Sequence, residues 1–93
     1  MRITYDPQKR EKTLSERGLD FEDTPKVFAG THLQLEDDRQ DYGERRWQVV
    51  GRLNDEVVMV VWTPRGRARH IISMRKCNDR EKRKYLARLG GSG

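Results

Sequence analysis

The stretch RWQVVGRLNDEVVMVVWTPRGRARHIISM, residues 46–74, decides the fold, because it reads as three consecutive strands joined by tight turns. Alternating and β-branched residues predict strands at both ends. Residues 57–62 between them are apolar throughout, which is typical of a central strand. Asn54-Asp55 and Pro64-Arg65-Gly66 are turn signals at the two junctions. Short turns between neighbouring strands predict an antiparallel meander.

Helix signals flank the meander on both sides. Asp6-Pro7 is a cap followed by a first-position proline, and Gly18 is a natural end for the helix that follows. A second, shorter helix is expected between Asp20 and Gly30, and weak alternation over residues 31–35 gives a possible fourth strand. Asn78-Asp79-Arg80-Glu81 resembles a capping box that opens a last helix. The sequence therefore predicts an α+β domain with two N-terminal helices, an antiparallel sheet of three to four strands and a C-terminal helix.

Length and composition exclude several classes of protein. The 93 residues fit one domain, expected over residues 1–89, with Gly90-Gly91-Ser92-Gly93 as a flexible tail. No apolar run approaches the ~18 residues of a membrane helix. The single cysteine, Cys77, leaves no disulfide framework and no cysteine-rich zinc site. We expect a soluble, cytoplasmic protein without a metal or other cofactor.

Charge is distributed unevenly along the chain. Residues 1–44 carry seven Lys/Arg against eleven Asp/Glu, whereas residues 45–93 carry thirteen against four. A basic second half indicates a polyanion such as nucleic acid as a partner. Two simpler interpretations stay open at this point: a solvated charged surface, and pairing of the arginines with the acidic first half.

The segment from Arg65 to Lys76 is the richest candidate site. Simple strand alternation places Arg67, Arg69 and Arg75 on one face, where guanidinium groups would match the phosphates of a nucleic-acid backbone. His70 falls on the opposite face. An imidazole can move a proton near neutral pH, and RNA carries its own nucleophile, the 2′-hydroxyl. Only a bulge or a strand end would bring His70 beside the arginines, so a structural role for His70 is an equal alternative.

Other candidates are weaker. The sequence has no glycine-rich phosphate loop, no nucleophile elbow and no cluster at metal-ligand spacing. The acidic stretch at residues 36–41 lacks the glycine and distal glutamate of a calcium loop, so a solvated loop is the preferred interpretation. Trp47, Trp62 and Tyr85 lie in apolar patterns and are expected in the core.

Several short motifs resemble those of the BrnT toxin family, which belongs to type II toxin–antitoxin systems. They occur in the family's order from Tyr5 to Tyr85 and comprise Tyr5-Asp6-Pro7 with Lys9, Gly18-Leu19-Asp20-Phe21-Glu22, Val27-Phe28, Gly43-Glu44-Arg45-Arg46, Val50-Gly51-Arg52 and Ile71-Ile72-Ser73-Met74-Arg75 with Glu81. The resemblance implies a RelE-like ribonuclease fold in a bacterial cytoplasm and RNA cleavage that inhibits translation. It also implies neutralisation by a BrnA antitoxin, in a complex of two toxins with two antitoxins that contacts DNA only through the antitoxin.

The resemblance also suggests site residues. Lys9, Glu44, Arg46 and Arg75 match the family pattern, whereas His70 stands where the family tends to have arginine. The family's Asn…Lys-His-Gly at the end of the first helix is Thr13…Glu16-Arg17-Gly18 here. We predict a catalytic set of Lys9, Glu44, Arg46, His70 and Arg75, with RNA bound by Arg52, Arg65, Arg67, Arg69, Lys76 and Arg80. The alternative is a nucleic-acid-binding or regulatory module without catalysis. We expect the antitoxin to cover the basic surface, in a complex that salt weakens.

Overall fold

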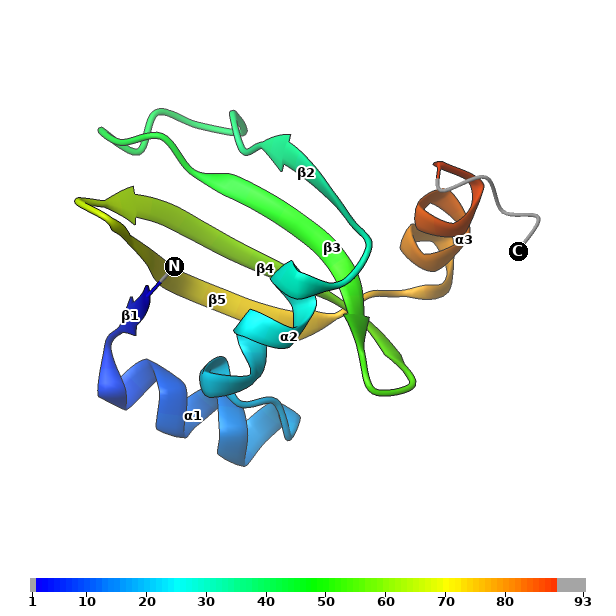
Figure 1. Ribbon diagram of the computed structural model, residues 1–93, viewed down its shortest axis with the longest axis horizontal. Helices are drawn as coiled ribbons and strands as arrows, with labels where there is room; N and C mark the ends of the chain where they lie inside the picture. The colour runs from blue at the N-terminus through cyan, green and yellow to red at the C-terminus, as the bar shows by residue number, and fades with distance from the viewer. Residues whose placement is uncertain (1, 89–93) are drawn as a thin grey trace.

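Residues 2–88 are described by a computed structural model, in which five strands form one sheet of order β1-β5-β4-β3-β2 (Figure 1). The predicted tail at residues 90–93 lies outside the described residues. The elements in chain order are β1 (Arg2–Tyr5), α1 (Pro7–Arg17), a 3-10 turn (Phe21–Asp23), α2 (Thr24–Ala29), β2 (His32–Glu36), β3 (Trp47–Leu53), β4 (Glu56–Arg65), β5 (Ala68–Lys76) and α3 (Asp79–Arg88).

The fold class is α+β as predicted, but the sheet is larger than expected. Strand β1 precedes the first helix and pairs in parallel with β5, with Thr4 opposite His70. The prediction of a purely antiparallel sheet of three to four strands is therefore wrong. A four-residue strand carries a short pattern, and a parallel partner 66 residues away leaves no turn signal in the sequence.

The predicted caps and turns are present at the helix ends and between the strands. The Asp6 side chain accepts a hydrogen bond from the backbone N–H of Gln8, and Gly18 ends α1 with a φ of 68°. The turn between β3 and β4 uses Asn54 at a φ of 55°, and the turn between β4 and β5 uses Gly66 at 59°. At α3, Asn78 and Glu81 cap each other's backbone N–H groups at 2.8 and 2.9 Å. These contacts confirm the first helix, the meander and the capping box.

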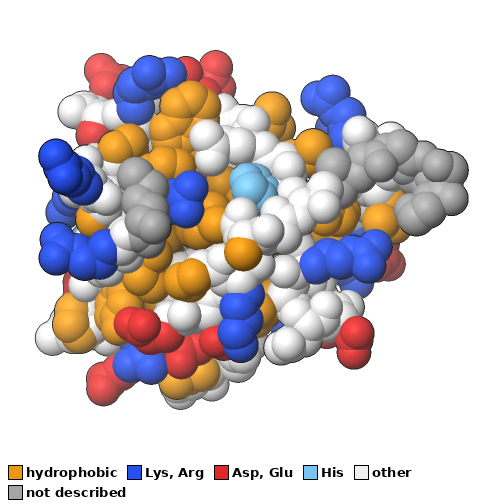
Figure 2. Space-filling model, viewed as in Figure 1, with side chains coloured by type: hydrophobic (Ala, Val, Ile, Leu, Met, Phe, Trp, Pro, Cys, Tyr) orange, Lys and Arg blue, Asp and Glu red, His pale blue; other side chains and the backbone are white. Residues whose placement is uncertain are grey.

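The main core lies between the sheet and the segment of Leu19, the 3-10 turn and α2, with α1 on the same side of the sheet. We call this side of the sheet the helix face (Figure 1). Phe21, Val27, Val49, Val58 and Val60 are fully buried there. The two helices cover only part of the face, and Figure 2 shows hydrophobic side chains gathered on the part they leave uncovered.

We call the other side of the sheet the open face, and α3 packs over one end of it. Tyr85 is buried with Val57 and Cys77, against Leu33 and other partly buried side chains. The Tyr85 hydroxyl donates to the carbonyl of Thr31 at 3.0 Å. This packing confirms the predicted core role of Tyr85. Trp62 is also buried, and Trp47 packs half-buried against the main core. No helix among residues 2–88 is long and apolar enough to cross a membrane.

A β-bulge interrupts the pairing of β4 and β5. Val61 lies opposite Ser73 and Trp62 lies opposite Ile71, so Ile72 has no partner across the ladder. An extra residue on one strand exchanges the two faces for everything beyond it. Ile71 and Met74 therefore both reach the main core, although three positions separate them.

Candidate nucleic-acid interface

The bulge decides which side chains of β5 share a face. Beyond Ile72 the alternation is inverted, and the register places His70 on the open face together with Arg75. The predicted row of Arg67, Arg69 and Arg75 on one face is wrong. Arg69 pairs with Pro64 and Ile3 on the helix face, and Arg67 lies in the turn before the strand. The sequence pattern predicted simple alternation because a bulge leaves no strong local signal.

His70 is held by the parallel edge strand. The Thr4 hydroxyl lies 2.9 Å from His70 Nδ1, and this contact holds the ring in place. The other ring nitrogen, Nε2, takes no part in it. Burial is the main cause that lowers the pKa of His70, and the positive charge of Arg65 lowers it further, against the opposing charge of Glu44. The imidazole is therefore neutral at neutral pH, the form that accepts a proton.

Glu44 lies between two arginines near this histidine. Its carboxylate pairs with Arg46 Nε at 3.2 Å and with Arg65 Nη2 at 3.8 Å. The Arg46 guanidinium also stacks on the ring of Tyr42, with its Cζ 4.0 Å from the ring centroid. Four of the predicted residues, Glu44, Arg46, Arg65 and His70, are thus brought into one neighbourhood. Glu44 belongs to the acidic first half of the chain, and both arginines belong to the basic second half. These two ion pairs therefore agree with the alternative interpretation that arginines of the second half pair with carboxylates of the first.

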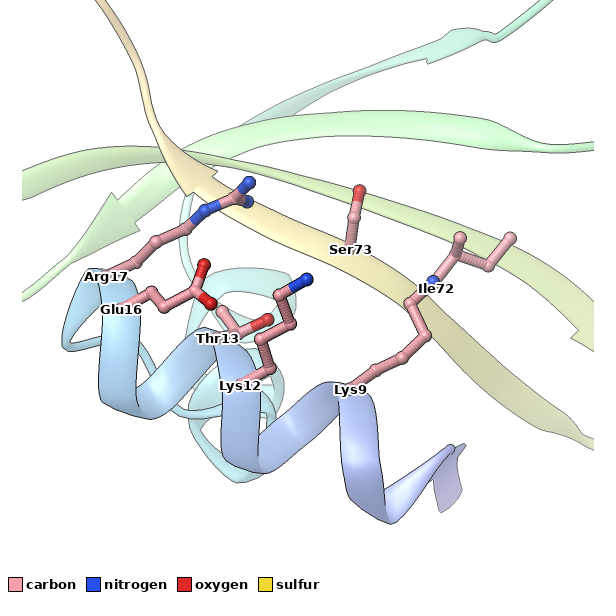
Figure 3. A pocket seen from close by; sticks show the side chains of 7 residues that line it. All are labelled: Lys9, Lys12, Thr13, Glu16, Arg17, Ile72 and Ser73. Carbon is pink, nitrogen blue, oxygen red and sulfur yellow. The ribbon is translucent and has the colours of Figure 1, made fainter.

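A shallow groove runs between α1 and the unpaired edge of β5, where β1 has ended (Figure 3). Arg17 Nη1 donates to the carbonyl of Met74 at 2.9 Å and so covers part of that strand edge. Lys9 is among the lining residues, and its charge is one of those that lower the pKa of His70. Lys12 also lines the groove, although the sequence pattern did not single it out. The full lining is Lys9, Lys12, Thr13, Glu16, Arg17, Ile72 and Ser73.

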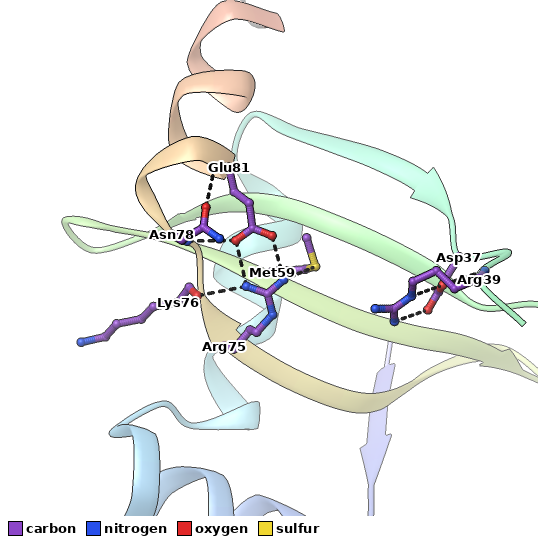
Figure 4. Close-up of polar contacts among 7 residues, drawn as sticks. All are labelled: Asp37, Arg39, Met59, Arg75, Lys76, Asn78 and Glu81. Carbon is purple, nitrogen blue, oxygen red and sulfur yellow. Dashed lines mark hydrogen bonds and ion pairs between the residues drawn. The ribbon is translucent and has the colours of Figure 1, made fainter.

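Arg75 is anchored to the start of α3 (Figure 4). Its two terminal nitrogens donate to the two carboxylate oxygens of Glu81, each at 2.8 Å. Arg75 is the main cause that lowers the pKa of Glu81 to about 2, and the backbone N–H of Asn78 adds to the effect. Because 42% of the Arg75 side chain is exposed, the guanidinium is both positioned by Glu81 and open to a ligand.

The loop after β2 adds a cation that sequence reasoning missed. Asp37 is buried and receives two hydrogen bonds from Arg39, at 2.7 and 2.8 Å. Arg39 is the main cause that lowers the pKa of Asp37. The Arg39 side chain itself is 64% exposed. Its positive charge repels that of Arg75 and so opposes the rise that Glu81 causes in the pKa of Arg75. This acidic stretch is organised by ion pairs with arginines, which its composition alone did not indicate.

The remaining predicted RNA contacts lie apart from this neighbourhood. Arg52 is exposed on β3 at the end near the turn to β4, and Arg80 is exposed on α3. Lys76 ends β5 opposite Val58, on the helix-face side, and pairs with Glu56 at 3.8 Å. The open face therefore carries two neighbourhoods of predicted residues, one around His70 and one around Arg75.

The pair of Arg75 and Glu81 predicts an acid-sensitive contribution to stability. Glu81 has a pKa near 2 when folded and near 4.5 ordinarily, so the folded state binds fewer protons. The contribution is therefore fully present above pH 4.5 and is lost as the pH falls towards 2. We expect the free energy of unfolding, measured in urea at pH 6, 4 and 3, to fall further in the parent than in Glu81→Gln. Parallel curves for the two proteins would contradict this assignment.

These features define a small α+β protein of the polyanion-binding class, with arginines and a neutral imidazole on an open sheet face. Residues 5–81 match the family described as the ribonuclease toxin, BrnT, of type II toxin–antitoxin systems, and the chain belongs to that family. It is therefore a ribonuclease toxin, with RNA as its substrate and an antitoxin as its partner. No curated protein matches the sequence.

Proposed function

We propose that the protein is a metal-independent endoribonuclease that inhibits translation in the bacterial cytoplasm. The observation that carries this proposal is the bulge at Ile72, which puts His70 on the same open face as Arg75. RNA cleavage needs a proton acceptor, cations that stabilise the phosphate and a proton for the leaving oxygen, and this face carries the first two kinds of group. Family membership supports a RelE-like arrangement of the site and neutralisation by a BrnA-like antitoxin in a two-to-two complex.

In the proposed mechanism, the 2′-oxygen of RNA attacks the adjacent phosphorus while the bond from phosphorus to the 5′-oxygen breaks. The products are a 2′,3′-cyclic phosphate and a 5′-hydroxyl. The neutral His70 accepts the 2′-hydroxyl proton, and solvent water at the open face donates a proton to the leaving 5′-oxygen. Arg46 and Arg75 stabilise the charge that builds on the phosphate, and Lys9 adds a further cation.

His70 is a better candidate than Glu44 for the base. Glu44 is engaged by Arg46 and Arg65, so its oxygen lone pairs are already directed at cations. His70 has a contact at Nδ1 only, and burial keeps its ring neutral. The neighbouring Glu44 then serves to orient the two arginines.

The proposal predicts RNA cleavage in the presence of excess EDTA. Purified parent protein should degrade total RNA under these conditions, and Arg75→Ala should lower the rate about 10²–10³-fold, the usual cost of losing one charge-stabilising group. Glu81→Gln is the matched control, because it breaks the same ion pair with α3 but keeps the guanidinium. It should retain most of the activity.

The outcomes separate the possible readings. Equal loss in Arg75→Ala and Glu81→Gln would assign Arg75 to anchoring α3 rather than to the phosphate. Activity that EDTA abolishes would overturn metal independence. RNA binding without turnover by the parent, on free RNA and on ribosomes, would favour the non-catalytic module instead.

A further inference from the structure

The helix face carries a group of aromatic side chains around one arginine, most of them half-buried. We call Ile3, Phe28, Trp47, Trp62 and Arg69 the aromatic patch. The register aligns Trp47 with Trp62, Trp62 with Ile71, and Arg69 with Ile3 and Pro64, which places these strand residues side by side. Phe28 joins them from α2, with its ring centroid 6.0 Å from that of Trp62. Figure 2 shows hydrophobic side chains exposed on this side of the molecule.

Within residues 2–88, Arg69 is held in the patch by contacts with aromatic rings. Its Cζ lies 3.9 Å from the ring centroid of Phe28 and 5.2 Å from that of Trp62. Its side chain makes no hydrogen bond and no ion pair with any residue from 2 to 88, and Nε is buried without an acceptor there. Burial lowers the pKa of Arg69, which reflects the cost of removing a charged guanidinium from water.

Other arginines of the chain are compensated in one of two ways. Arg10, Arg39 and Arg75 each meet a carboxylate within 2.8 Å. Arg52 and Arg67 are exposed to solvent. Arg69 has neither form of compensation, since it is half-buried and unpaired among the described residues. A guanidinium in this state gains strongly from a carboxylate that is brought to it in an apolar setting.

The surroundings of Arg69 fit a protein segment better than RNA. Half-buried aromatic residues with a central arginine are the composition of binding hot spots in protein interfaces. RNA binding calls for several cations along the phosphate backbone. The cations around His70 and Arg75 meet that need on the open face. The patch offers aromatic surface with Arg69 at its centre, and Arg45, which stacks on Trp47, is already paired with Glu36.

We propose that the antitoxin docks on the aromatic patch, through a segment that places a carboxylate on Arg69 and apolar side chains on Phe28 and Trp47. This inference rests on the proposed function, because the occupant is the antitoxin that neutralises the ribonuclease. It adds the helix face to the basic surface that charge alone favoured. The antitoxin would hold the toxin from the side opposite His70 and reach the open face around the edge of the sheet.

The test uses the full-length toxin and the antitoxin encoded with it. Arg69→Met removes the charge with little loss of volume, and Trp47→Thr removes the neighbouring ring while keeping a residue that strands tolerate. Each should weaken the dissociation constant, measured by calorimetry, by about tenfold or more. Lys26→Met is the matched control, since Lys26 is a cation on α2 that pairs with Asp23 at the surface. It should change the constant less than about twofold.

Several outcomes would overturn the inference. Unchanged antitoxin binding by both patch variants, with thermal unfolding midpoints close to that of the parent, excludes the patch as the docking site. Loss of RNA binding by Arg69→Met with antitoxin binding retained would assign the patch to RNA. Should Trp47→Thr unfold, Arg69→Met alone decides the question. Cleavage by the free toxin is assayed separately, so failure of the proposed function leaves the antitoxin result standing.

Discussion

Replacing His70 with asparagine should lower the rate of RNA cleavage by about 10²–10⁴-fold, the usual contribution of a general base. Asparagine keeps a polar side chain that can still contact Thr4 Oγ1, but it cannot accept the 2′-hydroxyl proton. The measurement is the initial rate on RNA at saturating concentration, so that weaker binding does not mimic the effect. Because burial lowers the pKa of His70, the parent's rate should fall only below about pH 6.5, as the imidazole becomes protonated.

The second histidine provides the matched control. His32 lies on β2, on the helix face opposite Gly51, and its Nδ1 lies 2.8 Å from the carbonyl of Gly30. His32→Asn should therefore leave the rate and its acid limb unchanged. If the acid limb persisted in His70→Asn, another group would be the base, and Glu44 would be the next candidate.

Replacing Phe21 with alanine should destabilise the fold by about 3–5 kcal/mol, the usual cost of removing a large buried side chain. Phe21 is fully buried in the main core, and its ring packs edge-on against Tyr5 with the centroids 5.9 Å apart. A small domain is stable by roughly 5–15 kcal/mol, so much of the stability would be lost. Urea unfolding followed by circular dichroism measures the change.

Leu14→Ala is the control for this core substitution. Leu14 is 43% exposed on α1, so its truncation leaves no cavity and should cost less than about 1 kcal/mol. A similar loss in both variants would mean that α1 and the 3-10 turn contribute equally to the core, contrary to the burial.

Elements with local signals could be predicted from the sequence. Asp6 and Gly18 bound α1 by contacts within a few residues, and the turns at Asn54 and Gly66 set the order of β3, β4 and β5. Strand β1 could not be predicted in this way. Its partner Ala68–Ile71 lies far along the chain, and parallel pairing of four residues depends on the folded sheet rather than on nearby sequence.

The candidate site was predicted by residue type better than by position. His70 and Arg75 were named, but alternation separated them, and only the bulge brings them to one face. The spacing of the apolar residues Ile71 and Met74, three positions apart instead of two, is the signal that could have revealed it. Arg39 was missed because its place depends on the buried carboxylate of Asp37.

Ile72 separates the spacing of β5 in the sequence from its register on β4. A deletion of Ile72 would restore strict alternation, because Ile71 and Ser73 would then be neighbours in the chain opposite Trp62 and Val61. Every remaining residue of β5 would keep its partner and its face, so the imidazole of His70 would stay on the face of Arg75. Loss of this one residue should therefore leave the candidate site intact.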